Sequence, residues 1–327
     1  MPLKTFVGDV HMGTFGELAQ KVAQLEALGV EGYLHGDHLF GHPPRDAGDG
    51  KLDVGRAADP FSNLAAVGAL SERLVLGTLV ANAGFCHPAL VLRHFVQLAA
   101  LFGGERVLAG LGAGWSRDEF EALGIGLPPL GQRMEHLAGA AQLARAWFDT
   151  GIATVDAATF IARELPMAPA LQEPPRLMLG GGSEAVLRIA GGYADHVDLH
   201  PLAGRRGPNE MRRFLETTMS DAIKCVELLE AAEEAASRAP GTVERSMWMG
   251  LIEFCEPAEH RLAEEKLCQS VGIERRDLRE CPYVLIGDAE EIADVLADRR
   301  ERLGLDAVIV SLNAKLPRFM TEVASRL

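Results

Sequence analysis

Eight short apolar runs alternate with helical patterns along the chain, and this alternation limits the possible folds most strongly. The runs cover residues 3–9, 32–37, 74–80, 106–114, 176–182, 194–200, 246–254 and 306–312. Most are apolar at nearly every position, which is typical of strands that are covered on both faces. Eight strand-then-helix units predict an α/β protein with a TIM (β/α)8 barrel, in one domain over residues 1–327.

Start and stop signals support the helices between these runs. Asp59 is a suitable cap with Pro60 in the first turn, and the helix that begins at Pro88 ends before a glycine pair. Residues 149–176 and 203–245 are too long to be simple connections. We therefore expect insertions after strands 4 and 6, the second with a long Ala/Glu-rich helix that forms a solvated outer face.

The amino-acid composition limits which kinds of partner the protein can bind and indicates its cellular compartment. The 327 residues carry a net charge of −14, which argues against nucleic-acid binding because that requires a basic face. Five cysteines form no CxxC pair, as expected for reduced thiols in the cytoplasm. The sequence has no signal-peptide pattern and no run of about 18 apolar residues, so we expect no membrane contact.

Three alternate glycines, Gly110, Gly112 and Gly114, close the fourth run, directly before Trp115. A dinucleotide-binding loop needs GxGxxG and an acidic residue about 20 positions later, and both are missing. At the carboxyl end of a barrel strand, such glycines let a flat ring approach the backbone. The alternative is that they only relieve crowding inside the barrel.

Asp37 and His38 follow the second strand and are the candidate catalytic residues. Histidine exchanges protons near neutral pH, and a neighbouring carboxylate fixes its tautomer. The alternative is a structural hydrogen-bonding role at the barrel rim. Together with His35 and His42 the pair could suggest a metal site, but no metal-binding spacing appears, and we expect no metal.

Three further features have a chemical and a simpler interpretation. The turn 180–183 offers backbone N–H groups to an anion at a helix start, although Ser183 is also an ordinary N-cap. Arg205, with Arg206, can pair with an anion or be solvated. Cys86 and His87 suggest a thiolate–imidazole dyad, but adjacent side chains usually point apart.

Three stretches, 76–125, 174–201 and 281–310, resemble the bacterial luciferase-like monooxygenase superfamily. The last of them most resembles a subgroup that uses the deazaflavin coenzyme F420. The resemblance implies a TIM barrel that holds F420 or, alternatively, FMN at the carboxyl ends of its strands. The chain departs from the family pattern at Cys86, where arginine is usual.

The resemblance also implies which residues do the work. His38 would transfer the proton, and Asp37 would orient it or accept a hydrogen bond from the cofactor. A non-proline cis bond is expected at Leu79–Val80, the cofactor phosphate at 180–183, and Trp115 beside the ring or over the pocket. The implied cofactor-binding residues are Leu79, Val80, Asn82, Gly112, Ala113, Gly114, Trp115, Gly180, Gly181, Gly182, Ser183 and Arg205. The expected substrate-side residues are His11, Met12, His200, Glu253 and Asn313.

Three functions follow as hypotheses. The first is an oxidoreductase that moves a hydride between a reduced deazaflavin or FMN and a small organic substrate. A deazaflavin has carbon in place of the flavin N5, so it transfers hydride without activating oxygen. The second is an FMN-dependent monooxygenase supplied by a separate reductase, and the third is a non-catalytic flavin-binding protein. We expect a homodimer.

Overall fold

The computed structural model describes residues 2–10, 13–40, 57–200 and 210–327. The chain groups into two compact units, which are described separately. The N-terminal unit comprises residues 8–179, and the C-terminal unit comprises residues 1–7 and 180–327. The prediction of a single domain stays a prediction.

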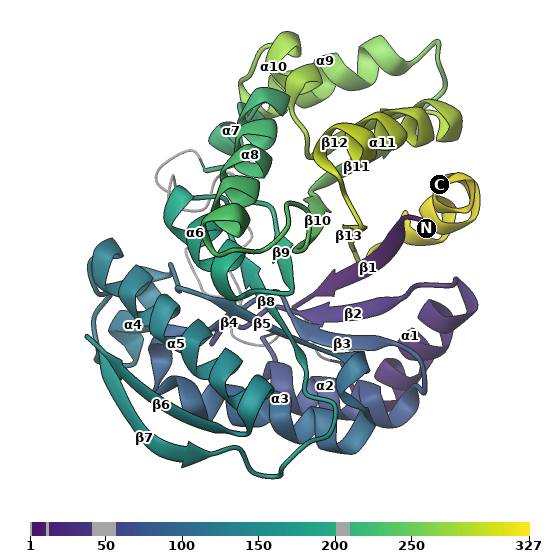
Figure 1. The fold of residues 1–327 in the computed structure, drawn as a ribbon. Helices are drawn as coiled ribbons and strands as arrows, with labels where there is room; N and C mark the ends of the chain where they lie inside the picture. Colours follow the sequence, from purple (N-terminus) through teal and green to yellow (C-terminus); the bar gives the residue numbers. More distant parts are fainter. Residues whose placement is uncertain (1, 11–12, 41–56, 201–209) are drawn as a thin grey trace. The chain divides into compact units, whose positions relative to one another are not determined.

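The strands confirm the predicted TIM (β/α)8 fold (Figure 1). Its eight strands are β1 (Lys4–Asp9), β2 (Gly32–His35), β3 (Val75–Thr78), β5 (Val107–Gly112), β8 (Arg176–Gly180), β9 (His196–Asp198), β10 (Glu244–Met249) and β13 (Ala307–Ser311). In the N-terminal unit, β3 pairs in parallel with β2 and β5, and β5 with β8. In the C-terminal unit, β10 pairs in parallel with β9 and β13.

Local signals set the helices of the N-terminal unit. These helices are α1 (Phe15–Ala27), α2 (Pro60–Leu70), α3 (Pro88–Phe102), α4 (Arg117–Ala122) and α5 (Leu130–Thr150). The predicted cap of α2 is present, because the Asp59 carboxylate accepts a hydrogen bond from the Ser62 N–H at 2.6 Å. Gly103 ends α3 with a φ of 94°, which favours glycine.

The predicted insertion at 149–176 contains a hairpin that the sequence pattern did not specify. Strands β6 (Ile152–Ala157) and β7 (Phe160–Pro166) pair antiparallel and lie along α5 (Figure 1). The Trp147 indole N–H donates to the carbonyl of Leu165 at 2.9 Å and so ties the hairpin to the helix. Only one face of the hairpin is covered, and its apolar runs are therefore short.

The prediction that the Ala/Glu-rich helix forms a solvated outer face is only partly right, because the helix exposes one face and buries the other. In the C-terminal unit, α8 (Met219–Ala235) packs on α6 (Glu184–Tyr193), and its Leu229 is fully buried. A Cβ on Gly191 of α6 would lie 2.6 Å from the Cβ of Ala232. The alanines therefore allow close helix packing, which made the helix look less apolar than it is. Shorter helices α7 (Glu210–Leu215) and α12 (Leu316–Arg318) belong to the same unit.

The prediction of one strand over 246–254 is also wrong. Strand β10 stops at Met249, and β11 (Leu251–Phe254) pairs instead with β12 (Val284–Gly287) in a separate two-stranded parallel sheet. The break falls at Gly250, where a Cβ would lie 2.6 Å from the ring of Phe214. Apolar residues on both sides of the glycine hide this change of sheet in the sequence.

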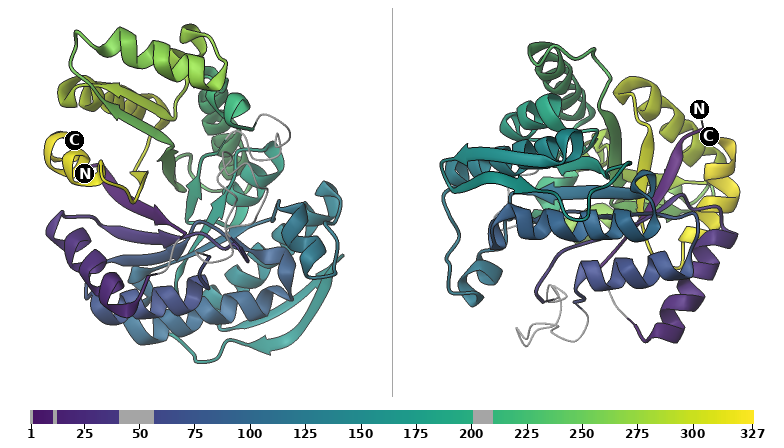
Figure 2. Two further views of the ribbon diagram at one scale, coloured as in Figure 1. Left: turned by 180° about the vertical axis from the view of Figure 1, so that it is seen from behind. Right: turned by 60° about the horizontal axis from the view of Figure 1, so that its bottom comes forward.

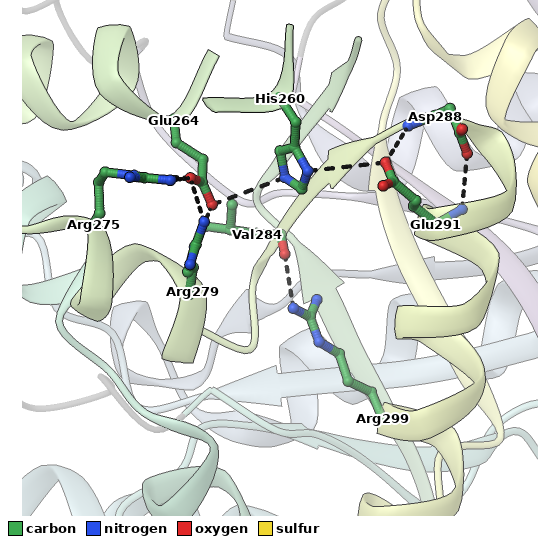
Figure 3. A network of polar contacts seen from close by, with 8 residues as sticks. All are labelled: His260, Glu264, Arg275, Arg279, Val284, Asp288, Glu291 and Arg299. Carbon is green, nitrogen blue, oxygen red and sulfur yellow. Dashed lines mark hydrogen bonds and ion pairs between the residues drawn. The ribbon is translucent and has the colours of Figure 1, made fainter. Parts of the chain in front are cut away.

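A buried carboxylate holds the segment between β11 and β12. This segment forms α9 (His260–Val271) and α10 (Arg275–Glu280), and it is followed by β12 and α11 (Ala289–Leu303). The Glu264 side chain is 3% exposed and accepts hydrogen bonds from Arg275 and Arg279 (Figure 3). Burial opposes ionisation of Glu264, but the two guanidinium groups lower its pKa. His260 lies 3.9 Å from both Glu264 and Glu291 and links α9 to α11.

The start of β1 lies beside the last helical turns of the chain in all three views (Figure 1 and Figure 2). The Lys4 N–H of β1 donates to the carbonyl of Asp306 at 3.0 Å, just before β13. Among the described residues, no helix is both long and apolar enough to cross a membrane.

Candidate functional site

The turn between β3 and β4 (Ala81–Asn82) is the centre of the candidate site in the N-terminal unit. The expected non-proline cis bond is present between Leu79 and Val80. The Thr78 hydroxyl donates to the carbonyl of Gly110 at 2.6 Å and accepts from the Ala81 N–H at 3.1 Å. This single side chain fixes the turn 78–82 against β5.

Gly110 and Gly112 of β5, with Gly114 just after the strand, make room for that turn. A Cβ on Gly110 would lie 2.0 Å from the Thr78 carbonyl oxygen, and one on Gly112 would lie 2.5 Å from Val80 Cγ2. Gly114 has a φ of 69°, and its Cβ would lie 2.4 Å from Asn82 Oδ1. Protein packing therefore already requires these glycines, as the crowding alternative states. The contact of a flat ring with Gly112, Ala113 and Gly114 stays a prediction.

His38 is oriented by Glu119 of α4, a residue that the sequence did not single out. The His38 Nδ1 lies 3.0 Å from Glu119 Oε1, and the same oxygen accepts from the Leu39 N–H at 2.9 Å. The Glu119 side chain is only 3% exposed, whereas that of His38 is 22% exposed. An ionised Glu119 can only accept a hydrogen bond, so the His38 proton that it binds stays on Nδ1. Proton exchange by His38 then takes place at the other ring nitrogen, Nε2. The acidic stretch after Trp115 was the available signal, 81 residues away from His38.

Asp37 instead contacts the backbone of the central turn. Its Oδ2 accepts a hydrogen bond from the Asn82 N–H at 2.9 Å. Burial raises the pKa of the Asp37 carboxyl, while the Asn82 hydrogen bond and His38 oppose that rise. Asp37 thus ties the end of β2 to the turn 78–82, and Glu119 makes the contact with the His38 ring.

Trp115 lies beside the candidate proton-transfer group. Its ring centroid is 5.7 Å from that of His38, and the two rings meet edge to face at 79°. Arg133 of α5 donates to the carbonyl of Gly114, and His136 donates to that of Ala83 at 2.8 Å. The sequence did not single out these two side chains, which hold the backbone just before Trp115 and just after β4 in place.

The structure does not form the Cys86–His87 dyad. The His87 Nδ1 accepts from the Ala89 N–H at 3.2 Å, and its Nε2 contacts the carbonyl of Ile161 at 3.3 Å. One ring nitrogen therefore caps the start of α3, and the other contacts β7 of the hairpin. Cys86 is exposed, and partial burial together with Asp37 raises the pKa of its thiol. A raised thiol pKa disfavours the reactive thiolate.

The turn 180–183 belongs to the C-terminal unit and follows β8. Gly181 has a φ of 144°, and its N–H donates to the carbonyl of Asp198 at 3.0 Å. The Ser183 hydroxyl accepts from the Val186 N–H at 3.4 Å and caps α6. The carbonyl of Gly182 accepts from the Cys225 thiol. The turn is thus a capped helix start, as the simpler interpretation states, and the phosphate role stays a prediction.

The remaining predicted residues fall into two groups. Arg205 and Arg206, together with His11 and Met12, lie outside the described residues. In the C-terminal unit, Glu253 forms an ion pair with Lys315, and Asn313 Oδ1 accepts from the Lys315 N–H at 2.9 Å. The His200 ring lies 5.7 Å from that of Tyr283. Within the described ranges, no group of three or more acidic, histidine or cysteine side chains is arranged to hold a metal.

Curated relatives match about half of the chain. The F420-dependent glucose-6-phosphate dehydrogenase of Nakamurella multipartita is 30% identical over 187 residues, which are 55% of this chain and 50% of that protein. Pyrimidine monooxygenase RutA of Methylobacterium radiotolerans is 28% identical over 141 residues, 42% of this chain and 36% of that protein. The chain spans about half the length of the F420-dependent relatives that it matches.

Solved structures match over the whole chain. An F420-dependent secondary alcohol dehydrogenase in complex with an F420–acetone adduct has a TM-score of 0.74 at 16% identity, covering 99% of this chain and 98% of that one. The oxygenating constituent of 3,6-diketocamphane monooxygenase from Pseudomonas putida, in complex with FMN, has a TM-score of 0.66 at 12% identity, covering 100% and 99%. At these identities the likeness shows the fold alone. Residues 2–222 match the family described as luciferase-like monooxygenase, and the chain therefore belongs to that family.

Proposed function

We propose that this protein is an oxidoreductase that transfers a hydride between reduced F420 and a small organic substrate. The single observation that carries the proposal is the His38–Glu119 pair beside Trp115 and the turn 78–82. The F420-dependent proteins among its relatives and structural neighbours support the choice of cofactor. The proposal includes one domain over 1–327, a cytoplasmic homodimer, and no role for nucleic acid or membrane.

The residues around the turn 78–82 suit the flat ring of the cofactor, and those at the start of α6 suit its phosphate. Around the turn 78–82, Val80 and Asn82 fill the space beside Gly112 and Gly114, so the ring would lie against these two side chains and the backbone of the turn. In the C-terminal unit, the first turn of α6 carries N–H groups that favour a phosphate next to Ser183. For the N-terminal unit we propose that Leu79, Val80, Asn82 and Ala113 contact the ring, and for the C-terminal unit we propose that the turn 180–183, with Arg205, contacts the phosphate.

The side chains supply proton transfer and positioning. When bound, the reduced cofactor supplies the hydride. His38 gives or takes a proton at Nε2, while Glu119 keeps Nδ1 protonated and stabilises the imidazolium when it forms. Trp115 packs edge to face against His38 and helps to position its ring. Asp37 keeps the turn 78–82 in place through the Asn82 N–H.

A two-component FMN-dependent monooxygenase, fed by a separate reductase, is the second candidate. A pyrimidine monooxygenase among the relatives and an FMN complex among the structural neighbours favour it. The two candidates differ in oxygen use, since reduced FMN with oxygen must support turnover only in the second.

Cofactor titration tests the proposal. We expect F420 to bind at least about ten-fold more tightly than FMN, which is a difference in binding free energy of about 1.4 kcal/mol. The absorption spectrum of each cofactor, recorded during the titration, measures its binding. Tighter binding of FMN, with oxygen-dependent turnover, would support the monooxygenase. Millimolar binding of both would leave only a non-catalytic role.

The phosphate position is tested by Ser183→Asp, with Ser183→Asn as its matched control. Both replacements are good N-caps and keep the helix start. Only the aspartate adds a negative charge to the anion position, so we expect it to weaken cofactor binding by about ten-fold or more. Equal affinities of the two variants would place the phosphate elsewhere.

A further inference from the structure

A line of four polar side chains runs along β9 and β10 in the C-terminal unit. The strands pair in parallel, with His196 opposite Glu244 and Asp198 opposite Ser246. The Ser246 hydroxyl donates to Asp198 Oδ1 at 3.3 Å and lies 2.9 Å from His196 Nε2. The other ring nitrogen, Nδ1, lies 3.5 Å from Glu244 Oε2. Each side chain therefore reaches the next across the pair of strands.

The line lies on the inner face of this part of the barrel. Arg245, between Glu244 and Ser246, donates to Glu230 of α8 at 2.8 Å and to the carbonyl of Leu303 of α11 at 3.3 Å. Successive side chains of a strand point to opposite faces. Glu244 and Ser246 therefore point away from the two covering helices.

The two ends of the line differ in their access to water. Glu244 begins β10 and is 29% exposed, next to Lys4 at 3.4 Å. His196 and Ser246 have no exposed surface, and Asp198 is 6% exposed. Asp198 ends β9, and the carboxyl ends of the strands are where TIM-barrel enzymes carry out chemistry. Hydrogen bonds thus connect Asp198 through Ser246 to His196, and the 3.5 Å contact between His196 Nδ1 and Glu244 continues the line to the opposite end of the barrel strands.

The Asp198 carboxyl is suited to hold that proton. Burial raises its pKa to about 7, and the Ser246 hydrogen bond only partly opposes this. Among the described residues, Tyr283 is a further titratable group that responds to the charge of Asp198. Burial and the negative charge of Asp198 raise the pKa of the Tyr283 hydroxyl well above its usual value, so it stays neutral.

We propose that Asp198, Ser246 and His196 form a buried proton relay that exchanges the Asp198 proton with solvent at the Glu244 end. Ser246 passes its proton to Asp198, His196 Nε2 passes its proton to Ser246, and Nδ1 takes one up at Glu244. Asp198 gains one proton, and His196 Nδ1 takes one proton from solvent, so the number of protons balances. Here the serine lies between the histidine and the aspartate, unlike a nucleophilic triad, in which the histidine lies between the other two. Its use in turnover rests on the proposed oxidoreductase function, as a proton supply for the carboxyl end of β9.

The relay is tested first without cofactor, so the result does not depend on any activity. Protein labelled with ¹³C at the aspartate carboxyl is titrated by NMR, and one signal is expected to titrate at about 7. This signal should vanish in Asp198→Asn and persist in Asp294→Asn, which changes an exposed aspartate of α11. Ser246→Ala should move its midpoint upward by about one pH unit, because the carboxylate loses a hydrogen bond. Absence of the signal, or an unchanged midpoint in Ser246→Ala, would overturn the proposal.

Unfolding stability gives a second equilibrium readout. The pKa of Asp198 is raised from 3.8 to about 7 in the folded state, so the folded state binds the extra proton between these values. The wild type should therefore lose stability relative to Asp198→Asn as the pH rises from about 4 to 7, with a constant difference above 7. A difference that does not change with pH contradicts a protonated Asp198.

The exchange route is tested by transfer into D2O at pH 6. Infrared spectroscopy follows the C=O band of the protonated Asp198 carboxyl, which shifts when deuterium replaces its proton. This shift should be slower in Ser246→Ala and His196→Gln. It should keep the wild-type rate in Asp294→Asn. Equal rates in all four proteins would show that the proton reaches Asp198 by another path. If exchange slows but the protein lacks oxidoreductase activity with any cofactor, the relay stands and the proposed function fails.

Discussion

Replacing His38 with alanine is expected to lower turnover by about 10²–10⁴-fold while cofactor affinity changes by no more than about a few-fold. The reason is that His38 carries the exchangeable proton at Nε2, while binding depends on backbone segments that the substitution leaves in place. Steady-state kinetics and a cofactor titration measure the two quantities separately. His94→Ala is the matched control, since His94 is an exposed histidine of the same unit that stacks on Phe61.

The same kinetic measurements test the role of Glu119. Glu119→Gln keeps an oxygen for the Leu39 N–H but removes the charge that stabilises a protonated His38. The loss of one charge-assisted hydrogen bond predicts a fall in turnover of about ten-fold or more. In the His38→Ala background, the Glu119 change should have no further effect, because the two act as one unit. Wild-type turnover in His38→Ala would remove this pair from the mechanism.

Replacing Gly110 with alanine is expected to destabilise the protein by about 3 kcal/mol or more and to abolish cofactor binding. The added Cβ would lie 2.0 Å from the carbonyl oxygen of Thr78, and a backbone atom cannot move aside without shifting the turn 78–82. Because the turn also carries the Asp37–Asn82 hydrogen bond, the site would be displaced with it. Urea unfolding and cofactor titration measure the two effects.

Gly131→Ala is the matched control for this substitution. Gly131 lies in α5, and a Cβ added there would have no atom within 4 Å. Alanine at this position should therefore leave the stability of the protein unchanged or raise it by up to about 1 kcal/mol. Similar stability of the two variants would mean that the backbone at Gly110 has more room than the structure indicates.

The sequence predicted the fold well because the barrel strands are continuous apolar runs with clear helix signals between them. It failed where the deciding contact is distant in the chain. The break at Gly250 depends on Phe214, and the burial of α8 depends on the fit of Ala232 against Gly191. Neither contact leaves a periodic pattern that a window along the chain could detect.

The candidate site was predictable in part for the same reason. Asp37, His38 and the glycines of β5 are adjacent to strand ends, where a barrel gathers its functional groups. Glu119 was missed because it lies 81 residues from His38 on a short helix, within an ordinary acidic stretch. The roles of the glycines were ambiguous, since both close packing and a bound ring require the absence of a side chain.

The position of Cys86 offers a practical way to observe the candidate site. All five cysteines lie in the described part of the chain, and Cys86 is the exposed one. A maleimide fluorophore would therefore attach next to the turn 78–82 without any engineered mutation. Because burial and Asp37 raise the pKa of this thiol, labelling should be slow at neutral pH and faster in mildly alkaline buffer. The attached dye would report in real time when a ligand reaches the end of β3.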